Sequence, residues 1–373
     1  MKRFLPLVFA SVMTISACAG NTAGTAGNTA GSANSAGGKY DLALITDLGT
    51  IDDKSFNQGA WEGLQQYATE KNITHKYYQP TEQSDDAYIN GIDLAVKGGA
   101  KLIVTPGFLF EVPVFKAQDQ FPDVKFVLID GNPHNTDYSV FKTAANAVGI
   151  TYAEEQAGFL AGYAAVKDGM TKLGFMGGMA VPAVIRYGYG YLQGAEYAGK
   201  EMGLAAGAVT VNYHYTGDFK ASPEVQTMSA SWYNDGIEVI FGCGGAVGNS
   251  VMAAAEQANK KVIGVDVDQS SQSPTVITSA MKGLRVSVYD CIKDFYDNKF
   301  PGGQNLIFSA KNNGVALAMD TAKFTKFTKA DYDAIFAKLA SDSITIVRDT
   351  DSSNKSVEIS ALPLSIVKTN EIK

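Results

Sequence analysis

Short apolar runs alternate with longer amphipathic runs from residue 40 onward, and no other feature of the sequence restricts the possible folds as strongly. The apolar runs, which we expect to form strands, are 41–47, 75–80, 101–107, 125–131, 172–178, 209–217, 239–245 and 261–268. The amphipathic runs, which we expect to form helices, are 55–71, 86–98, 151–167, 183–201, 223–234 and 247–259. Apolar strands that are each followed by a helix are typical of parallel sheets covered on both faces. The sequence therefore predicts an α/β protein.

The runs fall into two blocks, and a chain of 373 residues is long enough for two domains. One sheet is expected to use the strands from 41 to 131 and the other those from 172 to 268, with 139–150 crossing between them. Two further strand-like runs, 275–282 and 306–319, are expected to return to the first lobe and to cross again. The predicted architecture is two doubly wound parallel-sheet domains joined by a multi-strand hinge.

These crossings predict the boundaries of the two lobes. The N-terminal lobe is expected to comprise 39–145 plus 269–305, and the C-terminal lobe 146–268 plus 306–373. Ligands of doubly wound sheets bind beyond the carboxyl ends of the strands. We therefore expect the two lobes to enclose a cleft at those ends.

The N-terminal segment has the organisation of an export signal. Residues 1–17 combine a basic start with an apolar stretch that is too short to span a bilayer. The signal ends in Ile15-Ser16-Ala17-Cys18, which resembles the lipobox of bacterial lipoproteins, so we expect Cys18 to be acylated. The alternative is a cleavage site that a cysteine follows by chance.

The segment after Cys18 is of low complexity. Residues 19–38 contain only Ala, Gly, Asn, Thr and Ser, a composition that is typical of a flexible tether. We therefore expect a protein that is anchored to the cell membrane by lipid and faces the periplasm or the cell exterior.

The chain is acidic, and its cysteines form no recognisable motif. The formal net charge of −7 makes nucleic acid and anionic membrane surfaces poor partners. The spacing of Cys243 and Cys291 matches no metal or redox motif, and we expect both to be buried thiols.

Polar residues and glycines stand at the ends of four predicted strands. Asp47, Asp130 and Asp266 each end one strand, and a glycine-rich turn at 242–248 ends another. All four places should face the cleft.

The first of these strand ends leads into a helix that begins near Phe56. Ser55 is a natural N-cap, and acidic residues such as Asp53 are favourable at the positive end of a helix. Phe56 is spaced to pack into the core of the lobe, but an aromatic side chain in the first turn can equally lie over a flat ligand.

The sequence offers little support for catalysis. The three histidines, His75, His134 and His214, belong to no HExxH motif, and neither GxSxG nor CxxC occurs. The run 242–250 is rich in glycine but lacks the ending of a phosphate loop. We therefore favour a binding protein over an enzyme and expect no metal or cofactor.

Several motifs resemble one known family. The lipobox, TDLGTIDDKSFNQGAWEGL, FVLIDG, TYAEEQAGFLAGYAA, GGAVGNSV, VIGVDVDQ and VITSAMKGLRVSVYD are similar to the basic membrane protein family of substrate-binding lipoproteins, which serve ABC transporters. The motifs resemble those of its purine nucleoside receptors. The resemblance spreads over most of 41–290 and implies a type I periplasmic-binding-protein fold that captures a purine nucleoside for a transporter permease.

The resemblance also implies which residues contact the ligand. Phe56 would stack on the purine, and Asn57 would contact the base. Asp47 and Asp130 would be further ligand contacts from the first lobe.

Another set of residues would hold the ribose. The resemblance implies Asp266, Lys282 and the backbone of Gly244 and Gly245 for this role. The second aromatic wall could be either Tyr187 or Phe219.

Three other functions remain open from the sequence. A receptor of the same fold for a sugar or an autoinducer uses similar Asp and aromatic residues. An extracellular nucleoside hydrolase would use an Asp cluster near the N-terminal strand to bind Ca²⁺. A surface adhesin is disfavoured by the polar strand ends. For the favoured receptor we expect a monomer.

Overall fold

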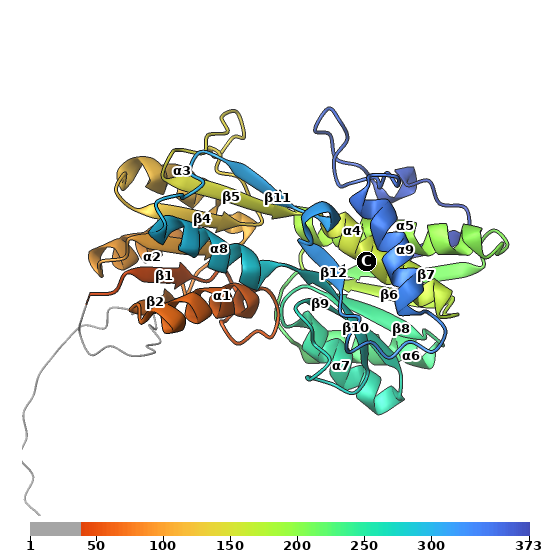
Figure 1. Cartoon of the computed structure of the whole chain (residues 1–373). Coiled ribbons are helices and arrows are strands. Elements are labelled where there is room, and N and C mark those ends of the chain that lie inside the picture. The colour runs from red at the N-terminus through yellow and green to blue at the C-terminus, as the bar shows by residue number, and fades with distance from the viewer. Residues whose placement is uncertain (1–38) are drawn as a thin grey trace, which may run out of the picture.

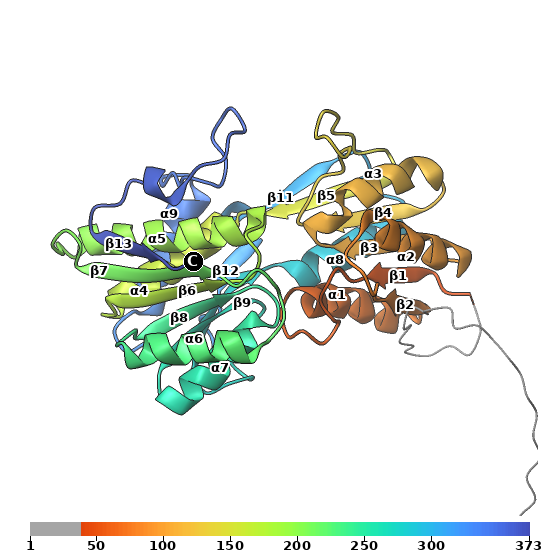
Figure 2. The ribbon, with the colours of Figure 1, turned by 180° about the vertical axis from the view of Figure 1, so that it is seen from behind.

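Residues 39–373, which the computed structural model describes, form two lobes that lie side by side (Figures 1 and 2). The expected signal peptide, Cys18 and the tether lie outside the described residues. The strands are β1 Leu42–Ile45, β2 His75–Tyr78, β3 Leu102–Pro106, β4 Lys125–Ile129, β5 Ala147–Tyr152, β6 Lys172–Gly177, β7 Val209–Tyr215, β8 Val239–Cys243, β9 Lys261–Asp266, β10 Val276–Lys282, β11 Asn305–Phe308, β12 Val315–Leu317 and β13 Val367–Glu371. The helices are α1 Phe56–Lys71, α2 Asp85–Lys97, α3 Glu111–Gln120, α4 Glu154–Lys167, α5 Pro182–Glu201, α6 Pro223–Asn234, α7 Val247–Ala258, α8 Leu284–Tyr296 and α9 Lys329–Ala340, with short 3₁₀ helices at Phe108–Phe110, Ala310–Asn312 and Ile359–Ala361.

The first sheet has the order β11-β5-β4-β3-β1-β2, and all of its strands are parallel. Successive side chains of a strand point to opposite faces. Leu42 and Leu44 therefore pack with α1 and α8, whereas Ala43 and Ile45 pack with α2 and α3 on the other face. Burial on both faces explains why these strands are apolar throughout.

The second sheet has the order β12-β10-β9-β8-β6-β7-β13. Its strands are parallel except for β12, which pairs antiparallel with β10 at the edge. Helices α4 and α5 cover one face, and α6 and α7 cover the other. Both sheets thus have the predicted α/β arrangement.

The chain crosses between the lobes three times. It leaves the first sheet after β5, returns after β10 into α8, and crosses again between β11 and β12. Figure 1 shows these segments in the middle of the molecule.

The expected assignment of the crossing strands was wrong. β5 pairs with β4, so the segment expected to cross at 139–150 contributes a strand to the first sheet. β10 pairs with β9 and belongs to the second sheet, whereas β11 pairs with β5 in the first. Hydrophobic periodicity identifies a strand, but it does not show which of two equally apolar sheet edges the strand joins.

The close approach of α4 and α5 positions part of the cleft. A β-carbon on Gly158 would lie 2.0 Å from the carbonyl oxygen of Tyr187, and one on Gly190 would lie 2.1 Å from that of Glu155. These contacts leave no room for a larger side chain. They bring the start of α4, with Glu154, against the first turns of α5.

Candidate ligand-binding cleft

A cavity of about 330 Å³ lies between the two lobes at the carboxyl ends of their strands. All ten residues predicted to contact a ligand line it, namely Asp47, Phe56, Asn57, Asp130, Tyr187, Phe219, Gly244, Gly245, Asp266 and Lys282. The structure therefore brings together residues that are spread over more than 230 positions, from 47 to 282. Cavity-lining residues that the sequence analysis missed include Gln79, Phe108, Val181, Val184 and Lys220.

Two aspartates occupy corresponding places in the two lobes. Asp130 follows β4 and Asp266 ends β9, and these strands hold the same position in the order of their sheets. Both residues have left-handed backbone angles, with φ of 61° and 66°. Aspartate adopts this conformation more readily than most residues. Both side chains line the cavity and are largely buried, Asp266 at 4% exposure and the side chain of Asp130 at 8%.

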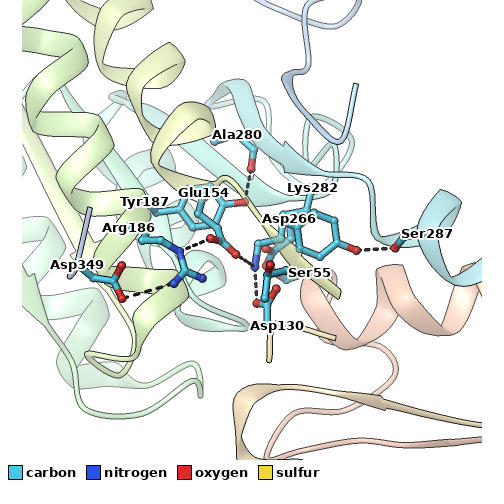
Figure 3. Close-up of polar contacts among 12 residues, drawn as sticks. Ser55, Asp130, Glu154, Arg186, Tyr187, Asp266, Ala280, Lys282, Ser287 and Asp349 are labelled. Atoms are coloured by element: carbon cyan, nitrogen blue, oxygen red, sulfur yellow. Dashed lines mark hydrogen bonds and ion pairs between the residues drawn. The ribbon is translucent and has the colours of Figure 1, made fainter. Parts of the chain in front are cut away.

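Lys282 lies at the centre of a buried ionic network (Figure 3). Its Nζ is 2.5 Å from Oδ2 of Asp130 and 3.1 Å from Oε1 of Glu154. Burial alone lowers the pKa of Lys282, but the neighbouring carboxylates, chiefly that of Asp130, outweigh this and raise it. Lys282 is therefore charged, and it joins the end of β10 to residues of both lobes.

Glu154 and its second partner, Arg186, were not predicted from the sequence. Nε of Arg186 lies 2.6 Å from Oε2 of Glu154, and the guanidinium continues to Asp349 at 3.5 Å, as Figure 3 shows. Burial alone raises the pKa of Glu154, but Arg186 and Lys282 outweigh it and lower this pKa. A signal for Glu154 was present, because α4 is apolar on nearly all sides and an acidic residue there must be buried beside a cation.

Ser55 connects the lobes instead of capping α1. Its side chain makes no capping bond, and its Oγ donates to Oδ2 of Asp266 at 2.5 Å. Gln269 and Gln272 donate to the carbonyl oxygen of Lys54, so three hydrogen bonds tie the start of α1 to the second lobe. Asp53 accepts from the backbone N–H groups at the helix start, as expected for an acidic residue there.

Asn57 lies between two carboxylates of the first lobe. Its Nδ2 donates to Oδ1 of Asp47 at 3.0 Å and to Oδ2 of Asp53 at 3.1 Å. Burial raises the pKa of Asp47 and of Asp53, although the hydrogen bonds that each accepts act in the opposite direction. This arrangement places a dense set of oxygen acceptors at one end of the cavity.

Aromatic side chains from both lobes face the cavity. Phe56 and Phe108 come from the first lobe, and Phe219 and Tyr187 come from the second. Phe56 and Phe219 are half-buried, whereas Tyr187 is 1% exposed and donates its hydroxyl to the carbonyl oxygen of Ala280. Phe56 and Phe219 therefore have ring surface available in the cleft that Tyr187 lacks.

The glycine-rich turn after β8 brings backbone close to Phe219. Gly244 and Gly245 have φ of 136° and 52°, and a β-carbon on Gly245 would lie 3.0 Å from the carbonyl oxygen of Phe219. Cys243 also lines the cavity; it and Cys291 are buried free thiols, which confirms that prediction.

Within residues 39–373, no three His, Cys, Asp or Glu side chains are grouped so that they could hold a metal ion. The same residues include no helix with the length and hydropathy needed to cross a bilayer.

Two parallel-sheet lobes that enclose a cavity and share three crossings have the architecture of the periplasmic-binding-protein fold. A solute-binding protein of an ABC transporter system from Aeropyrum pernix K1 superposes with a TM-score of 0.72 at 23% identity, covering 84% of this chain and 95% of that one. Residues 41–351 match the family model of PnrA-like ABC transporter substrate-binding proteins, called Bmp. The chain belongs to this family.

Curated relatives agree with the family assignment. The "ABC transporter nucleoside-binding protein BmpA" of Lactococcus lactis subsp. cremoris is 32% identical over 342 residues, covering 85% of this chain and 90% of the relative. Basic membrane protein A of Borreliella burgdorferi is 29% identical over 320 residues, covering 84% of this chain and 89% of the relative. The resemblance found in the sequence motifs is thus confirmed at the level of the family.

Proposed function

We propose that this substrate-binding protein captures purine nucleosides in the interlobe cavity and presents them to the permease of an ABC transporter. The main support for the proposal is that aromatic rings and carboxylates from both lobes line the same cavity. A purine needs flat aromatic walls, and ribose hydroxyls need acceptors such as carboxylates. The Lactococcus relative that is named as nucleoside-binding supports the same ligand class.

The base is proposed to lie at the Asn57 end of the cavity. Phe56 would supply one stacking surface, and Phe219, whose ring is less enclosed than that of Tyr187, would supply the opposite one. Asp47 and Asn57 would contact the edge of the base.

The ribose is proposed to lie nearer the crossings. There Asp266, Asp130 and Lys282 lie around the ends of β9, β4 and β10. Ionised carboxylates accept hydroxyl hydrogens through charge-assisted bonds, which are about twice as strong as neutral ones. The turn at Gly244 and Gly245 would let backbone groups approach the sugar.

Ligand capture is proposed to proceed by closure of the lobes about the three crossings. A ligand shifts the equilibrium toward the closed form only if it binds that form more tightly. Contacts from both lobes to one nucleoside provide this difference. The closed form would then offer the permease a surface that the open form lacks.

The protein is proposed to act at the membrane through a lipid on Cys18, which lies outside the described residues. The 20 residues between Cys18 and Lys39 would allow the lobes to move relative to the bilayer. The ligand cavity would then face the aqueous space outside the membrane.

A thermal-shift titration of residues 39–373 against nucleosides, free bases and sugars tests the ligand class. Binding raises the stability by RT ln(1 + [L]/Kd), so the unfolding temperature should rise with the concentration of a purine nucleoside. A response to a sugar together with none to inosine, guanosine or adenosine would overturn the proposal in favour of a sugar receptor. Release of free base that stops on chelation of Ca²⁺ would favour a hydrolase.

A further inference from the structure

The side-chain amide of Asn57 can take one orientation. Its Nδ2 lies 3.0 Å from a carboxylate oxygen of Asp47 and 3.1 Å from one of Asp53. An ionised carboxylate only accepts hydrogen bonds, so the NH₂ group, and not the carbonyl oxygen, must face both carboxylates. Both amide hydrogens are thereby used within the protein.

The amide oxygen of Asn57 is left for another donor. Asn57 is 3% exposed and lines the cavity, and its Oδ1 is buried without a hydrogen-bond partner among residues 39–373. A buried acceptor without a donor is costly. An N–H group of a bound ligand would satisfy this oxygen.

Asp53 is itself held in place by the start of α1. Its carboxylate accepts from the backbone N–H groups of Ser55 at 2.8 Å, Asn57 at 3.0 Å and Gln58 at 3.1 Å. These bonds prevent the carboxylate from turning away from Asn57. The start of α1 thus fixes the position of Asp53, and Asp53 in turn fixes the orientation of the Asn57 amide.

We propose that Asp53 is a positioning residue that, together with Asp47, fixes the orientation of the Asn57 side chain. In this orientation the amide oxygen of Asn57 accepts an N–H from the base. The cavity therefore selects bases that donate a hydrogen bond at this edge. This inference rests on the proposed nucleoside function. Inosine and guanosine donate through N1–H, and adenosine donates through its 6-amino group. Purine riboside has the same ring system and sugar but no N–H on its base, so it leaves the oxygen of Asn57 unpaired.

Isothermal titration of residues 39–373, which comprise both complete sheets, with inosine and purine riboside tests the selectivity without any variant. Purine riboside is expected to bind at least about tenfold more weakly than inosine, because a buried acceptor stays unpaired. Equal affinities would overturn this inference and leave the proposed function standing. Failure of every purine nucleoside to bind would overturn both.

The variant Asp53→Asn tests the positioning role. The amide oxygen of the new asparagine can still accept from the N–H groups of Ser55 and Gln58 at the start of α1. Its NH₂ group then opposes the backbone N–H and the side-chain NH₂ of Asn57. The ratio of purine riboside Kd to inosine Kd is expected to fall to about threefold or less. Asp52→Asn, which removes the same charge at the exposed neighbouring position, should keep the wild-type ratio.

The ratio of the two Kd values distinguishes a positioning role from a general loss of stability, because a general loss would weaken the binding of both ligands equally. A wild-type ratio in a folded Asp53→Asn protein, as judged by its thermal unfolding, would overturn the role of Asp53. If this variant does not fold, the comparison of the two ligands on the wild-type protein still decides whether the amide oxygen selects a donor.

Discussion

Lys282 and Glu154 lie on two different crossings between the lobes, and their charged groups are 3.1 Å apart. The ion pair joins the end of β10 to the start of α4, and Asp130 extends it to the first lobe. The residues that line the ligand cavity thus also connect the segments about which the lobes would move.

Lys282→Met should strongly destabilise the protein. It leaves the buried carboxylates of Asp130 and Glu154 without this shared cation, and breaking a buried pair in this way costs about 3–5 kcal/mol. Urea unfolding followed by circular dichroism would measure the loss. Lys293→Met, which removes an exposed lysine on α8, should leave the midpoint nearly unchanged. Similar midpoints for the two variants would show that the network does not stabilise the fold.

Phe56→Ala should weaken nucleoside binding while leaving the protein folded. Stacking of a base on an aromatic side chain contributes about 1–3 kcal/mol, so Kd should rise between about fivefold and 150-fold. Titration calorimetry with inosine would measure the change. Phe141→Ala, at a residue that is 62% exposed on a loop, is the matched control and should bind like the wild type. An unchanged Kd for Phe56→Ala would place the base elsewhere.

Asp266→Ala should discriminate between ribosides and free bases. The carboxylate of Asp266 is proposed to accept hydrogen bonds from the ribose hydroxyls. Its loss should therefore raise the Kd for inosine by about tenfold or more, and should raise the Kd for hypoxanthine, the free base of inosine, much less. Parallel titrations with the two ligands provide the comparison. Asp268→Ala, two residues further along the chain at an exposed position, serves as the control. Equal weakening of both ligands would argue against a contact with the sugar.

Glu196 should make stability depend on pH in the acid range. Burial alone raises the pKa of Glu196, but hydrogen bonds from Lys200, Ser365 and the backbone at Val367 outweigh it and lower this pKa to about 2. Because the pKa of Glu196 is lower in the folded state, its carboxylate stabilises the protein when the pH is above the pKa of the unfolded state, about 4.3. This stabilisation disappears as the pH falls toward 2.

The variant Glu196→Gln isolates this effect. Its deficit in the free energy of unfolding should be largest at pH 7 and should shrink between about pH 4.3 and pH 2. Urea titrations at pH 7, 4 and 3 would show this trend, and Glu82→Gln, at an exposed loop position, gives the baseline. A deficit that stays constant over this range would mean that the carboxylate charge is not responsible.

Cys18→Ser should abolish the membrane attachment. The cysteine is the proposed acylation site, and thus the variant should take up no labelled palmitate and should leave the membrane fraction. Cys291→Ala, which alters a cysteine buried in the first lobe, should keep both the label and the membrane location. Labelled protein from the Cys18 variant would place the lipid on another residue.

Local patterns predicted the elements that carry the cleft. The strand runs that end at Asp47, Asp130 and Asp266 were recognisable because buried parallel strands are apolar on both faces, and a polar residue at their end is conspicuous. The helix expected at 183–201 was found at Pro182–Glu201. The helix expected at 151–167 begins only at Glu154, because β5 extends to Tyr152.

Long-range relationships could not be predicted in the same way. The bond from Ser55 to Asp266 joins residues 211 positions apart, and local rules favoured a capping role for this serine. The pairing of Arg186 with Glu154 likewise depends on how closely α4 and α5 approach each other. The hydrophobic periodicity of the sequence does not predict this distance. The strands β5 and β10, next to the edge of each sheet, were assigned to the wrong sheets for the same reason.

The three crossings also determine the order in which the two lobes can become complete. The first sheet lacks its edge strand β11, and α1 lacks its neighbour α8, until residues up to 308 are available, although the sheet itself begins at residue 42. Most of the second sheet, from β6 to β10, lies within the continuous stretch between these parts. During synthesis from the N-terminus, the lobe that begins first therefore cannot finish before nearly all of the other has appeared. Folding of the two lobes is in this way coupled, and neither half of the chain can serve as an independent receptor.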